Sequence, residues 1–209
     1  MRVEELLNII KERRSVRDFS RDSVSDREIQ VLLEAARFAP SNSNRQAWKF
    51  LIIKNNNVKK NIADVVNKKI AEIKEVLSEP ELIESFDNYS KYLTFFQDAP
   101  VVIIALSKQS PSFLERLSKK MNLEFADRKI NSELMSVSMA IQNIQLTAHA
   151  LGLGTCCMTG PLIAADEIKS LLDVQPPFEL AAIVPVGRYE QLPSVPPRKD
   201  VSLISEIIE

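Results

Sequence analysis

The sequence predicts a mixed α+β fold, arranged as a three-layer α/β/α sandwich with a long central helix. Three short apolar segments, at residues 49–54, 100–106 and 179–187, indicate strands, and segments of helical periodicity separate them. Strands that alternate with helices are typical of layered architectures. The chain has 209 residues, of which 45% are hydrophobic and 26% charged, so we expect a single domain over residues 1–209.

The first two expected elements are amphipathic helices. Residues 3–10 carry apolar side chains at the i, i+3, i+4 and i+7 positions of one helical face. Ser25 and Glu28 form a capping box, and residues 29–36 repeat the same apolar spacing behind it. A second helix is therefore expected to run to about Phe38, before a proline at position 40.

A buried strand is expected next, because residues 50–53 form a short apolar run. The apolar spacing of residues 58–77 predicts a third helix. The strand at residues 100–106 is rich in β-branched side chains and lacks polar alternation, so both of its faces should be covered.

The long central helix is expected over residues 132–151, which are apolar on most sides. A glycine-rich turn ends it, and a short helix at residues 165–172 precedes the last strand. The mixed-charge residues 107–131 are expected to form a helical lid insertion. Apolar side chains in the tail, residues 200–209, need a surface to pack on, such as another subunit.

Composition excludes several classes of function. The net charge of −1 and the pI of about 6.0 give no overall field for nucleic acid or anionic membranes, and we expect neither partner. The N-terminus lacks an apolar signal core, and the longest uncharged run is broken by polar residues and glycines, so we expect a cytoplasmic protein. Cys156 and Cys157 are adjacent and indicate small apolar packing instead of a disulfide framework or redox pair. With one histidine, no metal site is expected.

Three polar clusters, far apart in sequence, indicate one polar ligand site. Guanidinium groups suit phosphate and polarised carbonyl oxygens, and amides suit the alternating edge of a planar heterocycle. Taken alone, the first cluster is also typical of a solvated turn, and the second of a turn that ends a helix. The clusters are Arg13-Arg14-Ser15-Val16-Arg17, Ser41-Asn42-Ser43-Asn44-Arg45-Gln46 and Pro197-Arg198-Lys199.

In this order and at these distances, the motifs resemble the FMN-dependent nitroreductase family. The resemblance covers residues 4 to about 200 and implies that family's fold, an intertwined homodimer with two FMN sites at the subunit interface. It is carried by RRSVRDF at residues 13–19, APSNSNRQAWKF at 39–50, LGLGTC at 151–156, Val186-Gly187 and Arg198-Lys199.

The resemblance also implies which residues bind FMN. Arg13, Ser15 and Arg17 would bind it, with Arg17 near the N1/C2 carbonyl edge of the ring. Ser41, Asn42 and Asn44 would reach it from the partner subunit, with Gln46 near them. Thr159 and Gly160 would face flavin N5, and Arg198 with Lys199 would contact the phosphate. Arg14 is included among the predicted FMN-binding residues, although a position in solvent or at the subunit interface fits it equally well. No side chain is predicted to be catalytic.

The activity implied is an NAD(P)H oxidoreductase with ping-pong kinetics. NADH or NADPH would donate a hydride to flavin N5, and a small electron-poor acceptor, a nitroaromatic or a quinone, would take it. Alternatives are dehalogenation, flavin fragmentation, or a non-catalytic flavin-binding redox sensor. The chain departs from the family pattern at Ala47, Cys157 and Pro161, beside the ring, which leaves the acceptor class open.

Two further features are expected to be structural. The helical spacing of four aromatic residues favours core packing over substrate stacking. His149, on the central helix, is expected to be a buried, hydrogen-bonded histidine instead of a proton donor. The aromatic residues are Tyr89, Tyr92, Phe95 and Phe96.

Overall fold

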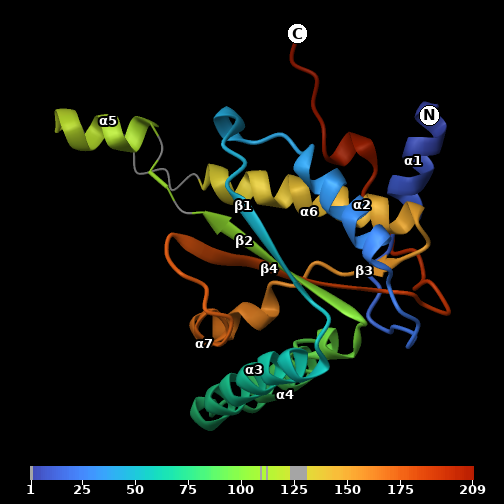
Figure 1. Ribbon diagram of the computed structural model, residues 1–209, viewed down its shortest axis with the longest axis vertical. Coiled ribbons are helices and arrows are strands. Elements are labelled where there is room, and N and C mark those ends of the chain that lie inside the picture. Colours follow the sequence, from blue (N-terminus) through green and yellow to red (C-terminus); the bar gives the residue numbers. More distant parts are fainter. Residues whose placement is uncertain (1, 109, 112, 123–130) are drawn as a thin grey trace.

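A four-stranded antiparallel sheet forms the middle of the computed structural model, which describes residues 2–108, 110–111, 113–122 and 131–209. The strand order is β1-β2-β4-β3 (Figure 1). The strands are β1 (Trp48–Ile53), β2 (Val101–Lys108), β3 (Gly154–Thr155) and β4 (Phe178–Gly187). The three strands expected from the sequence are confirmed, and the two-residue β3 is added to them.

Strand β2 is buried on both faces of the sheet. Ile103 and Ile104 point to opposite faces, and neither is exposed to solvent. The register between β2 and β4 shifts between Ala105 and Leu106, but both residues remain buried. This burial confirms the expectation that a β-branched strand without polar alternation is covered on both sides.

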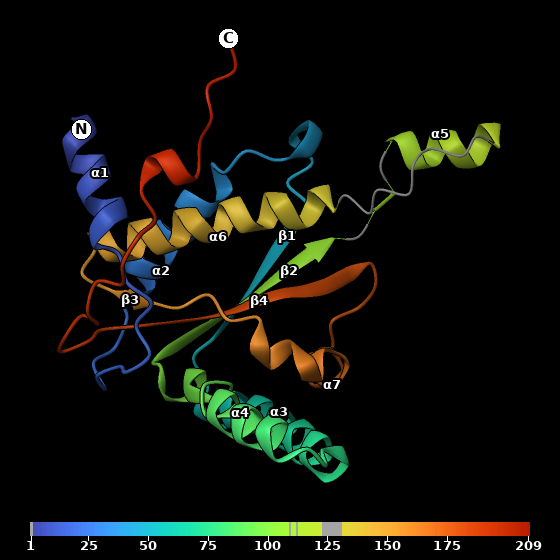
Figure 2. The ribbon, with the colours of Figure 1, turned by 180° about the vertical axis from the view of Figure 1, so that it is seen from behind.

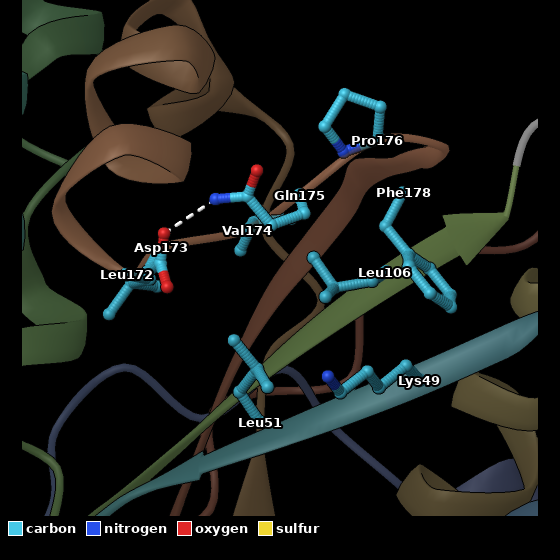
Figure 3. A pocket seen from close by; sticks show the side chains of 9 residues that line it. All are labelled: Lys49, Leu51, Leu106, Leu172, Asp173, Val174, Gln175, Pro176 and Phe178. Atoms are coloured by element: carbon cyan, nitrogen blue, oxygen red, sulfur yellow. Dashed lines mark hydrogen bonds between the residues drawn. The ribbon is translucent and has the colours of Figure 1, made fainter.

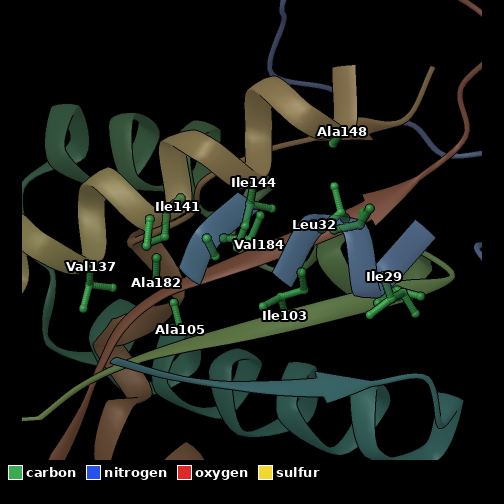
Figure 4. Packing of buried hydrophobic residues seen from close by; sticks show 14 of the residues in the cluster. Ile29, Leu32, Ile103, Ala105, Val137, Ile141, Ile144, Ala148, Ala182 and Val184 are labelled. Atoms are coloured by element: carbon green, nitrogen blue, oxygen red, sulfur yellow. The ribbon is translucent and has the colours of Figure 1, made fainter. Parts of the chain in front are cut away.

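Two helices, α2 (Asp26–Arg37) and α6 (Ser132–Ala150), cover one face of the sheet. Leu32 of α2, Ile144 of α6 and Val184 of β4 meet in one buried cluster (Figure 4). Helix α6 is apolar around most of its circumference and lies centrally, as the sequence predicts.

The opposite face is covered by a second set of helices, which completes the predicted three layers. Phe96 and Ile104 are fully buried in the cluster on this side. Lys59 is also buried, and its ammonium donates to the Ala99 carbonyl, which ties its helix to the turn before β2. The elements are α3 (Asn56–Val76), α7 (Ala165–Leu171), and the 3-10 helices η2 (Phe95–Asp98) and η3 (Gly160–Ala164), with α4 (Pro80–Ser90) beside α3.

Some apolar elements lie outside this sandwich. Helix α1 (Val3–Glu12) has no buried residue, although its spacing is amphipathic as predicted. Helix α5 (Phe113–Met121) projects from the body in both views (Figure 2). It belongs to the predicted lid insertion, of which residues 109, 112 and 123–130 lie outside the described part, while residues 107 and 108 belong to β2. Whether this insertion acts as a lid stays a prediction.

Candidate functional site

The basic stretch of residues 13–17 runs along the short strand β3. Ser15 forms a bridge with Thr155, and the Val16 N–H donates to the Thr155 carbonyl at 3.0 Å. Val16 lies so close to Gly154 that a Cβ on that glycine would be 2.7 Å from the valine side chain. Alternate residues of an extended segment point to opposite sides, so Arg13, Ser15 and Arg17 share the side away from Val16.

Arg13 carries an unusual polar group. Its Nη1 atom is buried, and no described residue accepts a hydrogen bond from it. A buried donor without a partner costs free energy, and a guanidinium suits an anionic oxygen. Arg13 therefore fits a ligand that brings phosphate or carboxylate oxygens to this point.

Arg14 is held mainly by backbone carbonyl groups, although its Nε, like Arg13 Nη1, is buried with no partner among the described residues. It is buried, and its Nη1 donates to the carbonyl oxygens of Lys11 at 2.6 Å and Arg13 at 2.7 Å. These bonds satisfy carbonyl groups at the end of α1. The side chain does not point to solvent, so that expected alternative is wrong, and a contact with FMN stays a prediction.

Arg17, Thr159 and Gly160 line one cavity of about 190 Å³. The Arg17 Nη1 donates to the Ser15 carbonyl at 3.2 Å, and its guanidinium lies 6.0 Å from the centre of the Tyr92 ring. The other lining residues are Tyr89, Tyr92, Leu93, Phe95, Cys156, Cys157, Met158 and Pro161. The cavity thus combines a cation, aromatic walls and a glycine turn.

Three of the four aromatic residues expected in the core, Tyr89, Tyr92 and Phe95, line this cavity, and of these Phe95 is partly buried against the core. Tyr89 is 53% exposed and Tyr92 is 58% exposed, whereas Phe96 is fully buried. Core packing is therefore wrong for the two tyrosines and confirmed for Phe96. The hydroxyl group is the sequence signal that distinguishes the two tyrosines from Phe96, because it can stay hydrated while the rest of the ring packs against apolar side chains.

The adjacent cysteines differ in their surroundings. Cys156 is buried as predicted, and burial raises the pKa of its thiol against the opposing influence of Arg17, Ser15 and Arg13. A protonated thiol of this kind is a weak nucleophile. Cys157 is exposed, so the predicted apolar packing is wrong for it.

The amide cluster forms a tight loop at the other end of the sheet. The 3-10 helix η1 (Asn42–Asn44) lies on the first turn of α6, where the Asn42 N–H donates to Ser136 Oγ at 3.2 Å. The Asn42 side chain donates to Ser132 Oγ at 3.0 Å, and the Gln46 N–H donates to Ser41 Oγ at 3.0 Å. These bonds fix the loop, and the Asn44 and Gln46 side chains stay exposed to solvent.

The two clusters lie at opposite ends of α6. The amide loop contacts its N-terminal turn, whereas residues 13–17 lie beside the turn and strand that follow its C-terminus (Figure 1). A helix of 19 residues is about 28 Å long, which exceeds the length of an FMN molecule. Within one chain, the structure does not bring these predicted site residues together.

The third cluster also stands apart. Arg198 and Lys199 are exposed, and no hydrogen bond or ion pair within the described residues joins either of them to Arg13. Their contact with a phosphate stays a prediction from the resemblance.

His149 lies near the basic stretch. It is half-buried, and no described residue forms a hydrogen bond with its ring, so the expected buried and hydrogen-bonded histidine is wrong in both respects. Burial lowers the pKa of the imidazole, and Arg13 and Arg14 lower it further against the opposing effect of Glu12. The ring is therefore neutral near pH 7.

A second cavity, of about 210 Å³, lies against the sheet near α7 (Figure 3). Leu51, Leu106 and Phe178 supply much of its apolar lining, and Lys49 lies at its side. It contains none of the residues predicted to bind a cofactor.

In the described part of the chain, no group of three His, Cys, Asp or Glu side chains is placed to hold a metal ion. None of the described helices has the length and apolar character to cross a membrane.

Comparison with known proteins places this geometry in context. A sequence profile of the Nitroreductase family matches residues 10–188. YfhC of Bacillus subtilis strain 168, named as an NAD(P)H nitroreductase, is 24% identical over 94% of this chain and 90% of its own length.

Two solved structures share the fold. The crystal structure of a BluB-like flavoprotein from Clostridium difficile 630 is 30% identical, with a TM-score of 0.87 over 100% of both chains. Iodotyrosine deiodinase bound to FMN and 3-iodo-L-tyrosine is 25% identical, with a TM-score of 0.72 over 94% of this chain and 96% of that chain.

Proposed function

The chain belongs to the Nitroreductase family, and we propose that it is a homodimeric, FMN-dependent NAD(P)H oxidoreductase that reduces a small electron-poor acceptor. The observation that carries the proposal is the Nη1 of Arg13, which is buried and has no hydrogen-bond partner among the described residues. Ser15 and Arg17 follow it two and four positions along the chain. A phosphate near Arg13 would satisfy that donor. The flavin-binding neighbours and the name of the B. subtilis relative support the same class of chemistry.

The residues of the chain would bind and orient the cofactor. Arg13 and Ser15 would hold the phosphate end, and Arg17 would lie at the redox-active ring. FMN, when bound, supplies two-electron chemistry by accepting a hydride from NADH or NADPH and donating it to the acceptor. A guanidinium beside the ring stabilises the negative charge of the reduced form and raises its reduction potential.

Gly160 provides room at the cavity wall. A Cβ at this position would lie 2.3 Å from Leu93 Cδ2 and 2.8 Å from the Tyr89 hydroxyl. With glycine there, both side chains can close on the turn, and its backbone N–H can face the ring. Tyr89 and Tyr92 would then form a wall beside the bound nicotinamide or acceptor.

The site would be shared by two subunits. The amide loop and residues 13–17 lie too far apart in one chain to contact the same FMN, so Ser41, Asn42, Asn44 and Gln46 would reach the cofactor bound to the partner. Helix α1, the tail and part of α6 expose apolar side chains that a second subunit can cover, including Val3, Leu6, Leu7, Ile10, Met135, Met139, Ile204, Ile207 and Ile208.

The visible spectrum of purified protein tests the proposal. We expect a yellow flavoprotein, directly or after incubation with FMN, that is bleached by NADH or NADPH under anaerobic conditions and reoxidised by a nitroaromatic or quinone. A protein that stays colourless after incubation with FMN contradicts FMN binding. A protein that binds FMN but is not reduced by either nicotinamide contradicts the NAD(P)H reaction and favours a redox sensor.

Reductive dehalogenation is a second candidate, favoured by the likeness to iodotyrosine deiodinase bound to its iodinated substrate. The same protein, reduced with dithionite, is mixed with 3-iodo-L-tyrosine in the absence of oxygen. Release of iodide with reoxidation of the flavin supports dehalogenation, and a flavin that stays reduced argues against it.

A further inference from the structure

The amide loop contains a concentration of backbone strain. Ser43, Asn44 and Gln46 have backbone φ angles of 52°, 51° and 49°. These angles lie in the left-handed region, which residues other than glycine rarely adopt. Only two other non-glycine residues in the described part of the chain share this feature. Such strain persists where the surroundings hold the backbone in place, and it gathers at binding sites.

Arg45, between two of these strained residues, is held by a buried carboxylate. Its Nη1 lies 2.8 Å from Glu133 Oε1, and it donates to Ser110 Oγ at 3.1 Å. The Glu133 side chain is only 6% exposed, and the Arg45 side chain is 25% exposed. An ion pair this shielded is screened little by solvent, and it restricts Arg45 to one position.

Both oxygens of Glu133 are occupied. Ser132 Oγ donates to Oε2 at 2.8 Å, and Ser110 Oγ lies 3.2 Å from Oε1. Burial alone would raise the pKa of this carboxyl, but hydrogen bonds from Ser132, its own backbone, Arg45 and Ser110 outweigh burial and lower it. Glu133 is therefore ionised at neutral pH and pairs with Arg45 as a charge.

We propose that Arg45 and Glu133 are positioning residues, which hold the amide loop in the conformation that binds FMN. The reason is geometric: Asn44 and Gln46 flank Arg45 on the chain, so movement of the Arg45 backbone rotates both amide-bearing neighbours. Glu133 belongs to the first turn of α6, a rigid element, and Ser110 connects the same pair to the chain that leaves β2. The proposal rests on the proposed function where it concerns FMN.

FMN titration of five variants tests it. Arg45→Met and Glu133→Gln each remove the charge pair, and the double variant removes both partners. Arg37→Met is the matched control, because Arg37 pairs with Glu34 on an exposed helix surface. If only about a tenth of the molecules of a single variant keep the amide loop in its FMN-binding conformation, the apparent Kd of that variant for FMN rises about tenfold.

The double variant and a lysine variant separate this role from general destabilisation. The double variant should bind FMN about as weakly as the weaker single one, because the two residues act through one contact. Arg45→Lys should recover most of the lost affinity, since the Glu133 contact uses a single nitrogen. Additive losses, or single variants that bind FMN as the unmodified protein does, overturn the proposal.

Hydrogen exchange of the flavin-free protein gives a readout that does not depend on FMN. The N–H groups of Asn44 and Gln46 donate within the loop, to the carbonyl and hydroxyl oxygens of Ser41. We expect faster exchange at residues 41–47 in Arg45→Met and Glu133→Gln, and unchanged exchange in Arg37→Met. Unchanged exchange in the loop, or an increase spread evenly over the chain, overturns the positioning role. If the unmodified protein binds no FMN, the proposed function fails, and this experiment still decides the role of the pair.

Discussion

Arg13 is the residue whose environment says most about a ligand. A buried guanidinium nitrogen without a partner is rare in folded proteins, because the unmade hydrogen bond costs free energy. No described residue accepts a hydrogen bond from it, and Ser15, two positions along the chain, carries a hydroxyl group. An anionic ligand explains both features together.

Replacing Arg13 should therefore weaken FMN binding. We expect Arg13→Ala to raise the Kd for FMN roughly 10- to 100-fold, the loss of a charge-assisted hydrogen bond. Arg198→Ala should act in the same direction if the tail reaches the phosphate. The control is Arg27→Ala, an exposed position on α2. Unchanged affinity in both test variants, measured by fluorescence titration, contradicts the phosphate assignment.

Tyr92 lines the cavity that Arg17, Thr159 and Gly160 also line, and we propose that the acceptor binds there. Tyr92→Leu removes the ring that lies over Arg17 while keeping an apolar side chain. We expect a higher KM for aromatic acceptors, by about 2- to 10-fold for the loss of a stacking contact, with little change in FMN content. Steady-state kinetics measure both quantities. Loss of FMN with unchanged KM would place Tyr92 in cofactor binding instead.

At the scale of elements, α6 connects the two halves of the candidate site. Its first turn holds the amide loop, and His149 in its last turn lies near Arg13 and Arg14. The folded-state pKa of His149 lies below its unfolded value of about 6.5, because burial disfavours the charged ring. As the pH falls through that value, the unfolded chain takes up a proton that the folded chain resists, so stability decreases.

His149→Gln should reduce this dependence on pH. We expect the unmodified protein to lose stability between about pH 7.5 and 5.5 and the variant to lose less, because the half-buried titrating group is gone. Urea unfolding at several pH values provides the measurement. Identical pH profiles for the two proteins would show that His149 does not contribute.

Helix η2 is held by its buried aromatic side chain. Phe96→Ala should destabilise the fold by about 3–5 kcal/mol, through lost burial and the cavity left behind. Phe38→Ala, at an exposed ring stacked on Arg37, should cost no more than about 1 kcal/mol. Similar losses of unfolding free energy in the two variants would contradict the placement of Phe96 in the core.

The strongly patterned elements could be predicted from the sequence. The capping box located the start of α2, the β-branched run located β2, and the apolar circumference of α6 indicated its central place. Strand β3 could not be predicted, because two residues carry no periodicity and the pairing depends on the close approach of Gly154 and Val16. The tyrosines of the cavity share the helical spacing of core residues, and in the sequence only their hydroxyl groups distinguish them from Phe96.

The candidate site was predictable in part. The resemblance pointed to the basic and amide clusters, and the structure places Arg17, Thr159 and Gly160 around one cavity. The role of Glu133 carried no signal in the sequence, because a lone carboxylate at a helix start is common. Glu133 lies 88 positions from Arg45 in the sequence, and its burial and its contact with Arg45 arise only when the chain folds.

At the scale of the whole molecule, two features favour a homodimer. These are the exposed apolar side chains and the separation, within one chain, of the two clusters predicted to bind FMN. We expect a dimer by analytical ultracentrifugation at micromolar concentration, because α1, α6 and the tail expose apolar surface that a single chain leaves uncovered. Ile10→Glu and Ile207→Glu should shift the population toward monomer and reduce FMN content together. A monomer that binds FMN normally would contradict a site shared between subunits.

The most direct test of the shared site is a dimer assembled from two different defective chains. One chain carries Arg13→Ala and the other Asn44→Ala; they are co-expressed with different affinity tags and the mixed dimer is purified through both. If each FMN is held by residues 13–17 of one subunit and the amide loop of the other, one site in the mixed dimer is intact, and it binds one FMN tightly. If each site lay within a single chain, both sites would be defective, and the absence of any tight site would contradict the account.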